Sequence, residues 1–232
     1  MSDCRSNVWL RHFRSARYET SGHADSFDRN LLLLRLVGPG KRVLELGCST
    51  GFITRRLLQQ HCVVTAVESD MEAAAVAANT AAVVLNRDLN SPLWTESLNT
   101  EFDVVLMGDV LEHLINPLNV LQQVRSLLRP GGKLVICLPN VVHWLTRLQI
   151  AAGRFNYQPI GTLDLTHLRF FTAASARSMI QAAGYRMLSF EPIIGGRMSG
   201  HFRPAWQLLA WIRPGLFAYQ FLISAAPASE IS

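Results

Sequence analysis

A short apolar strand followed by a glycine turn decides the fold of this chain: Val43-Leu44-Glu45-Leu46-Gly47-Cys48-Ser49-Thr50-Gly51. Glycine permits the positive φ angles that a tight turn needs and lets a ligand approach the backbone closely. Residues 52–60 then have the pattern of a helix. This order predicts a site for a nucleotide-like ligand, although the same kind of turn also serves as an ordinary connection between a strand and a helix.

The alternation of strands and helices continues along most of the chain. The expected strands are 42–46, 63–67, 82–85, 102–107, 133–138, 185–194 and 216–225. The expected helices are 28–37, 52–60, 71–78, 118–128, 141–152 and 172–183, with a loop at 153–166. This order predicts an α/β fold with a Rossmann-like, seven-stranded, mostly parallel sheet and helices on both faces. Ligands of such sheets bind beyond the carboxyl ends of the strands, so the loops there are where a site is expected.

The composition fits a single domain that spans residues 1–232. Hydrophobic residues make up 49% of the chain and charged residues 17%, which excludes a disordered protein. Residues 1–37 are expected to form an N-terminal helical segment, and residues 140–166 an insertion that serves as a lid or acceptor site. The four cysteines form neither a CxxC pair nor a cluster with histidine. We therefore expect no metal site, no disulfide framework and a cytoplasmic protein.

The net charge is +5, but the basic residues are scattered along the chain. This favours a solvated basic face and no nucleic-acid partner. Residues 205–226 are apolar over a length that could cross a bilayer, but Arg213-Pro214-Gly215 interrupts them. A helix followed by a buried strand is therefore expected. Peripheral membrane contact through Trp206 and Trp211 is the less favoured alternative. For the oligomeric state, both a monomer and a homodimer are compatible with the sequence.

Acidic residues accompany the first three strands. Glu68 directly follows the second strand, about 20 residues after the turn, where a carboxylate can accept hydrogen bonds from ribose hydroxyls. Asp88 follows the third strand and could accept from the exocyclic amine of an adenine. Glu45 lies inside the first strand, where burial without a partner is costly. It is expected to face a positive or donor-rich end of the ligand, or else to pair with Lys41 or Arg42.

This set of features resembles the class I S-adenosylmethionine-dependent methyltransferases. Their first motif matches residues 45–51, with Ser49 in place of the middle glycine, and their acids after strands two and three match Glu68 and Asp88. Their fourth and fifth motifs match residues 102–113 and 128–134. The resemblance spans roughly residues 28–190.

The resemblance implies that the cofactor is S-adenosyl-L-methionine. The expected cofactor-binding residues are Glu45, Gly47, Cys48, Gly51, Glu68, Ser69, Asp88, Leu89, Met107 and Asp109. A nicotinamide dinucleotide fits less well, because its pyrophosphate needs an open helix N-terminus. Here Phe52 and Ile53 follow the turn directly and the middle glycine is absent.

Two histidines are the candidate catalytic residues. His113 ends the segment Asp109-Val110-Leu111-Glu112-His113, and His167 lies in Leu163-Asp164-Leu165-Thr166-His167-Leu168-Arg169-Phe170-Phe171-Thr172. The second motif resembles a small-molecule subgroup that includes the ubiquinone-type O-methyltransferases. A hydroxyl acceptor benefits from a general base, which is often histidine. The alternatives are structural: His113 would cap the following loop, and His167 would pack against or orient Arg169 and Asp164.

We therefore expect methyl transfer to a small-molecule acceptor, most simply to a hydroxyl group in a biosynthetic pathway. The chain has no Asn/Asp-Pro-Pro-Tyr motif and no Pro-Cys pair, which argues against methylation of nucleic-acid bases. It also has no acidic cluster of the kind that suggests a magnesium-dependent catechol enzyme. The alternative is a methyltransferase-like accessory or regulatory protein that binds the cofactor and assists a partner enzyme.

Overall fold

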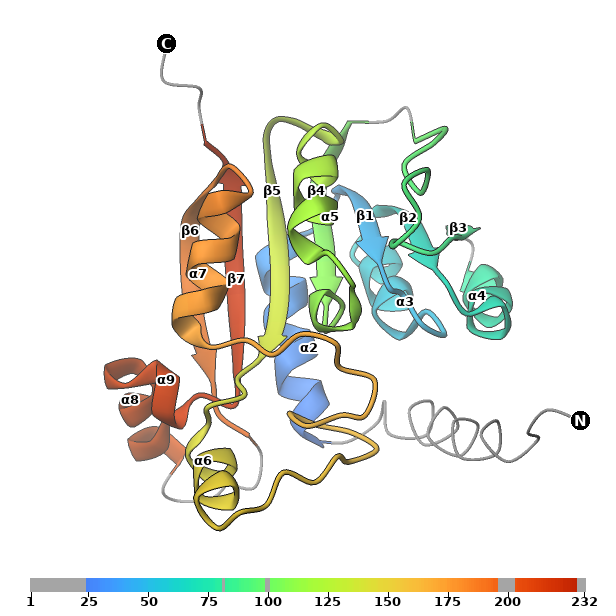
Figure 1. Cartoon of the computed structure of the whole chain (residues 1–232). Helices are drawn as coiled ribbons and strands as arrows, with labels where there is room; N and C mark the ends of the chain where they lie inside the picture. The colour runs from blue at the N-terminus through green and yellow to red at the C-terminus, as the bar shows by residue number, and fades with distance from the viewer. Residues whose placement is uncertain (1–23, 81, 99–100, 196–202, 229–232) are drawn as a thin grey trace, which may run out of the picture.

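One seven-stranded sheet organises the part of the chain that the structure describes (Figure 1). The structure is a computed structural model that describes residues 24–80, 82–98, 101–195 and 203–228. The strand order is β3-β2-β1-β4-β5-β7-β6, and β7 runs antiparallel to both of its neighbours. The strands are β1 Arg42–Leu46, β2 Val63–Glu68, β3 Val83–Asn86, β4 Phe102–Gly108, β5 Leu128–Pro139, β6 Tyr185–Ile193 and β7 Gln220–Pro227. The mostly parallel seven-stranded sheet predicted from the sequence is therefore confirmed.

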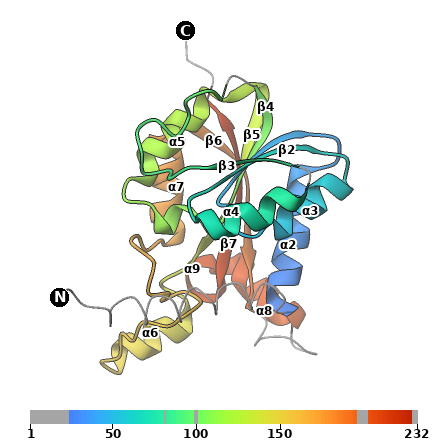
Figure 2. The same ribbon diagram turned by 90° about the vertical axis from the view of Figure 1, so that its right-hand side faces the viewer.

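Helices lie on both faces of this sheet (Figures 1 and 2). They are α2 Ala24–Val37, α3 Phe52–Gln59, α4 Met71–Ala77, α5 Pro117–Arg125, α6 Trp144–Ala151, α7 Ala173–Ala182, α8 Arg203–Ile212 and α9 Pro214–Phe217. Two short 3-10 turns, η2 Ala78–Thr80 and η3 Leu111–His113, follow α4 and β4. No helix among the described residues is long and apolar enough to cross a membrane.

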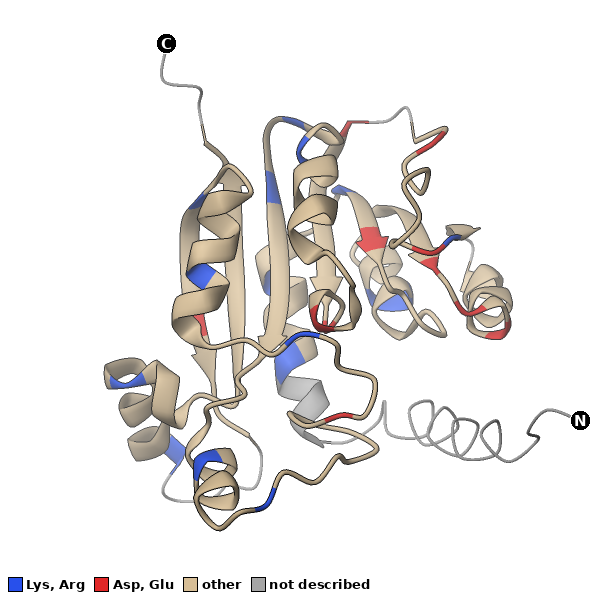
Figure 3. Cartoon of the chain, in the orientation of Figure 1, with Lys and Arg blue, Asp and Glu red and all other residues tan. Residues whose placement is uncertain are grey.

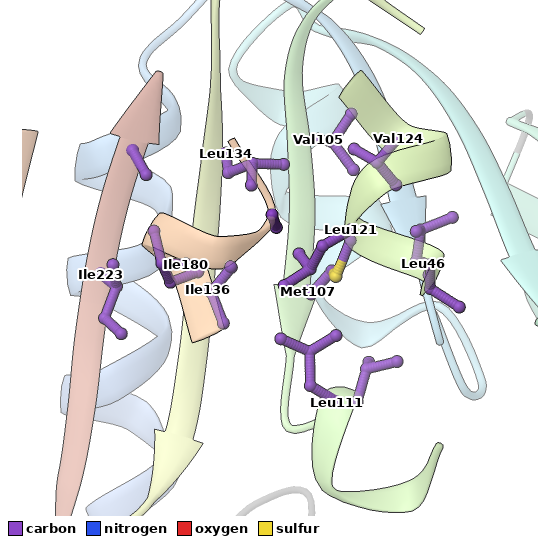
Figure 4. Packing of buried hydrophobic residues seen from close by; sticks show 14 of the residues in the cluster. Leu46, Val105, Met107, Leu111, Leu121, Val124, Leu134, Ile136, Ile180 and Ile223 are labelled. Atoms are coloured by element: carbon purple, nitrogen blue, oxygen red, sulfur yellow. The ribbon is translucent and has the colours of Figure 1, made fainter. Parts of the chain in front are cut away.

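The two faces of the sheet bury separate hydrophobic clusters, because successive side chains of a strand point to opposite faces. On β4, Val105 and Met107 join one cluster, whereas Val104 and Leu106 join the other. The first cluster packs against α5 and α7, as Figure 4 shows for Leu121 and Ile180. The second packs against α2 and α3. Burial on both faces explains why the central strands are almost continuously apolar in sequence.

Most predicted boundaries agree with the structure to within about two residues, which is the usual uncertainty of helix ends. Four predictions are wrong. The helix expected from Asp28 begins at Ala24. The helix expected over 118–128 ends at Arg125, and residues 129–132 lie within β5. The strand expected to begin at Leu216 begins at Gln220, because Pro214 starts the short helix α9. The helix expected from Val141 starts only at Trp144.

The error at residues 128–132 has a physical cause. The sequence Arg129-Pro130-Gly131-Gly132 has turn residues, and Gly131 does adopt a positive φ of 80°. However, Leu128 already pairs with Phe102, and the register of the ladder shifts before Val104 pairs with Lys133. The extra residues of β5 thus form an irregularity in its pairing with β4. Glycine and proline are typical of turns as well as of such irregularities, so the sequence does not distinguish the two.

Candidate functional site

The glycine turn between β1 and α3 lies at the carboxyl end of the parallel strands. Its backbone has positive φ at Gly47, Ser49 and Gly51, with values of 71°, 50° and 78°. A Cβ on Gly47 would lie 2.6 Å from a methyl of Val110, so this position requires glycine. Ser49 occupies the left-handed region, which shows that a small side chain fits where the family has its middle glycine.

The carboxylate of Glu68 lies beside this turn, because β1 and β2 are adjacent and end at the same edge. It accepts hydrogen bonds from the N–H of Ser49 at 2.8 Å, from the N–H of Asp70 at 2.9 Å and from the hydroxyl of Ser69 at 3.3 Å. The predicted residues Glu68 and Ser69 thus form one polar cluster with the turn. A carboxylate at this edge is the group that can bind a ribose diol.

Glu45 and Cys48 are both buried beneath the turn. The carboxyl of Glu45 accepts a hydrogen bond from the hydroxyl of Thr54 at 2.6 Å, and the ion pairs among the described residues do not join it to Lys41 or Arg42. Burial raises the pKa of Glu45 to about 7, with the charge of Glu68 adding to the rise and the Thr54 hydrogen bond opposing it. Burial likewise raises the pKa of the Cys48 thiol to about 12, so this thiol is neutral.

Hydrogen bonds between its own residues hold the loop after β3 in place. The carboxylate of the exposed Asp88 accepts from the N–H and the side-chain amide of Asn90, at 2.8 and 3.0 Å. Asn90 in turn accepts from the N–H of Ile115 at 2.9 Å, which joins this loop to the one after β4. Leu89 is buried in the core, so its side chain supports the loop from below.

Asp109 follows β4 with a φ of 57° and lies between two donors. Its carboxylate accepts from the guanidinium of Arg29 on α2 and, at 2.9 Å, from the side-chain amide of Gln220 on β7. Burial lowers the pKa of Arg29, but Asp109 and other neighbouring groups raise it more, so the net pKa rises. The side chain of Met107 is fully buried among Val105 and Leu111 (Figure 4), so only its backbone reaches the site.

The two candidate catalytic histidines lie side by side, with ring centroids 4.8 Å apart. The Nδ1 atom of His113 lies 3.1 Å from both the carbonyl and the hydroxyl oxygen of Thr166. That hydroxyl donates to Asp164 at 2.7 Å, so it accepts from the Nδ1–H of His113. The Nδ1 of His167 lies 3.2 Å from the carbonyl of Thr162. In both rings the acceptors at Nδ1 therefore favour a proton on that nitrogen.

The two histidines come together because backbone hydrogen bonds join the segment 109–113 to the segment 163–172. The backbone carbonyl of Glu112 accepts from the N–H groups of both Leu168 and Arg169, at 2.8 and 2.9 Å. Glu112 is itself buried, with a carboxylate oxygen 4.0 Å from the Nε2 of His167. No metal site is expected from the sequence. Among the described residues, Glu112, His113 and His167 nevertheless bring ligand-type atoms within 4.8 Å of one another, so this trio could also hold a cation.

The structure thus gathers the predicted residues at one edge of the sheet, in two groups. Glu45, Gly47, Gly51 and Glu68 surround the turn, while Asp109 and His113 lie in and just after the loop that follows β4. Sequence reasoning missed the side chains that hold these loops together: Arg29, Asn90, Thr166 and Gln220. Thr166 lies next to His167 within the motif at residues 163–172, so its position in the sequence could have indicated it. Nothing in the sequence pattern marks the other three residues.

A parallel sheet of this order, with a glycine turn after β1 and an acidic residue at the end of β2, defines an α/β protein of the class that binds a nucleoside-containing cofactor. The chain belongs to the methyltransferase domain family, whose model matches residues 10–189.

Its curated relatives include the ubiquinone biosynthesis O-methyltransferase of Aeromonas salmonicida, which is 27% identical over 170 residues that cover 71% of each chain. The enzyme of the same name from Coxiella burnetii is 26% identical over 162 residues, which cover 66% of this chain and 67% of that protein.

Two solved structures share the fold. One is an S-adenosylmethionine-dependent methyltransferase of Thermotoga maritima, described as a possible histamine N-methyltransferase (TM-score 0.65, 17% identity, 94% of this chain and 98% of that one). The other is the 1,6-didemethyltoxoflavin-N1-methyltransferase of Burkholderia thailandensis with S-adenosylhomocysteine bound (TM-score 0.62, 17% identity, 96% and 87%). The chain is an S-adenosylmethionine-dependent methyltransferase. The glycine turn after β1 and the carboxylate of Glu68 beside it fit this cofactor.

Proposed function

We propose that this protein transfers the methyl group of S-adenosylmethionine to a hydroxyl of a small-molecule acceptor, with His113 as the general base. His113 is less buried than His167. The main support for the proposal is the pair of hydrogen bonds that link the Nδ1 of His113 to the Thr166 hydroxyl and that hydroxyl to Asp164. The O-methyltransferase names of the curated relatives support a hydroxyl acceptor.

The residues of the chain perform three tasks in this reaction. The bound cofactor supplies an activated methyl on sulfur. The oxygen of the acceptor forms the new bond to carbon as the carbon–sulfur bond breaks, and the hydroxyl proton passes to Nε2 of His113. Asp164, acting through Thr166, keeps the proton of His113 on Nδ1 and stabilises the cation that forms. His167, held by the carbonyl of Thr162, packs against His113 and fixes the orientation of its ring.

The base assignment is tested by measuring transfer of radiolabelled methyl to a panel of phenols, sugars and amines. We expect transfer to hydroxyl acceptors, and His113→Asn should lower kcat by about 10²- to 10⁴-fold, the usual contribution of a general base. His61→Asn, which changes an exposed histidine at the end of α3, should have no effect. Thr166→Val should lower kcat and alter the acidic side of the pH profile, whereas Thr166→Ser should restore both.

Three outcomes would contradict this assignment. Transfer to amines alone would exclude a hydroxyl acceptor. Cofactor binding without transfer to any class of acceptor would favour the accessory role. Loss of activity after dialysis against a chelator, with recovery on adding a divalent metal, would assign Glu112, His113 and His167 to a metal instead of a base.

We also propose that Glu68 binds the ribose of the cofactor. Two hydrogen bonds from hydroxyls to a carboxylate contribute about 1.5–3 kcal/mol each, so Glu68→Ala should raise the Kd for S-adenosylhomocysteine about 100-fold or more in calorimetry. Glu72→Ala is the matched control, because Glu72 is an exposed acid in the first turn of α4. Equal affinities of the two variants would exclude this role.

A further inference from the structure

Helices α6 and α8 are joined by aromatic packing at the end of the molecule where the parallel strands have their carboxyl ends (Figures 1 and 2). The rings of Trp144 and Trp206 stack with centroids 6.3 Å apart, and Trp206 lies 5.9 Å from the ring of Phe217. Residues some 60 positions apart in sequence therefore bring α6 and α8 together, a contact that the positions of Trp206 and Trp211 in the sequence do not indicate.

Both helices expose large apolar side chains to the solvent. We call this surface the α6/α8 face and define it by Leu148, Leu208, Trp211 and Ile212, which are 59%, 61%, 56% and 62% exposed. In α8 the opposite side, at Ala210, is already buried, so these residues are not the side that packs on the protein. An ordinary surface helix is polar on its outer side, and a cluster of large exposed apolar residues marks an interaction surface.

The charges around the α6/α8 face have one sign. The sequence contains no Asp or Glu from residue 140 to 163 or from 192 to 229. Arg147, Arg154 and Arg213 are exposed there, and Figure 3 shows blue without red on α6 and α8. Two described acids that flank these segments already have partners, since Glu191 pairs with Arg35 at 2.9 Å and the buried Asp164 accepts from Thr166. Among the described residues, the face therefore combines apolar side chains with arginines, and its two segments carry no acid of their own.

We propose that the α6/α8 face docks on the surface of an anionic lipid bilayer. Apolar side chains can enter the boundary between headgroups and acyl chains, while arginines bind the anionic headgroups and tryptophan favours that depth. A second copy of the chain fits less well, because a symmetric contact would bring the same arginines together. From the sequence alone, peripheral membrane contact is the less favoured alternative; the exposed apolar residues of α6 and the charge pattern now favour it. This inference does not depend on which residue acts as the base.

Flotation of the full-length protein with vesicles tests the docking. We expect binding to vesicles of phosphatidylcholine with phosphatidylglycerol, weak binding to phosphatidylcholine alone, and loss of binding as salt rises from 50 to 500 mM. The double variant Leu148→Glu/Trp211→Glu should abolish binding. Arg147→Gln and Arg213→Gln should each lower the partition coefficient about fivefold, from the usual contribution of a basic residue near an anionic surface.

Matched controls separate docking from folding. Val76→Glu changes an apolar residue of α4 that is 48% exposed, and Arg186→Gln changes an exposed arginine of β6; both should bind vesicles as the wild type does. All variants should keep the wild-type affinity for S-adenosylhomocysteine. Equal binding to neutral and anionic vesicles, or none to either, would overturn the proposal. A dimer in light scattering that Trp211→Glu dissociates, without vesicle binding, would assign the face to a second copy.

Discussion

Glu45 shows how a single residue can contradict its local pattern. It lies in a strand whose neighbours Leu44 and Leu46 are fully buried, and its carboxyl is buried with them. The hydroxyl of Thr54 is the donor that the structure provides for it. One hydrogen bond does not compensate for the loss of water around a charge, which is why burial raises the pKa of this carboxyl to about 7.

This raised pKa predicts how stability depends on pH. Between its ordinary value of 4.5 and about 7, the folded protein keeps a proton on Glu45 that the unfolded chain has released. The free energy of unfolding should therefore fall as pH rises through this window, by at most about 3 kcal/mol. Glu45→Gln should remove that slope in urea unfolding between pH 5 and 8, whereas Glu72→Gln should keep it.

Parallel profiles for the wild type and Glu45→Gln would show that Glu45 is already ionised in the folded protein. The same measurement with saturating S-adenosylmethionine tests the predicted contact with the cofactor. If its positive end pairs with ionised Glu45, the slope should become smaller in its presence, since ligand binding then favours the charged form.

At the scale of elements, Asn140 explains where β5 ends and why α6 starts late. Its buried side-chain amide donates to the carbonyl of Ala218 at 2.7 Å, and its backbone N–H donates to the carbonyl of Tyr219 at 2.9 Å. The next residue, Val141, donates to the carbonyl of Phe171. These bonds hold residues 140 and 141 in an extended form, so the helix expected from Val141 cannot begin there.

Asn140→Ala should therefore destabilise the protein, because it leaves buried carbonyls at the start of β7 without a donor. We expect the free energy of unfolding in urea to fall by about 2 kcal/mol. Asn119→Ala is the control, since Asn119 is exposed on α5 and should change stability by less than about 0.5 kcal/mol. A similar change in both variants would mean that the contacts of the Asn140 amide contribute little.

At the scale of the whole molecule, the sheet brings distant loops to one edge. The ends of β1, β2 and β4 lie next to one another because these strands are parallel neighbours. The segment with His167, which directly follows the insertion at residues 140–166, then folds back onto the loop after β4 through the carbonyl of Glu112. The cofactor edge and the histidine pair thus come from segments more than 100 residues apart in sequence.

The sequence by itself determined the fold class and the succession of strands and helices along the chain. It also indicated which residues follow the strands, including Glu68, Asp109 and His113. It could do so because apolar periodicity and glycine turns are local signals, and because parallel strands place their carboxyl ends together. Only the tertiary structure decided which groups meet. Arg29 binding Asp109, Thr166 orienting His113 and Trp144 stacking on Trp206 all join segments without any shared local pattern. Such contacts depend on the geometry of packing, which no short stretch of sequence encodes.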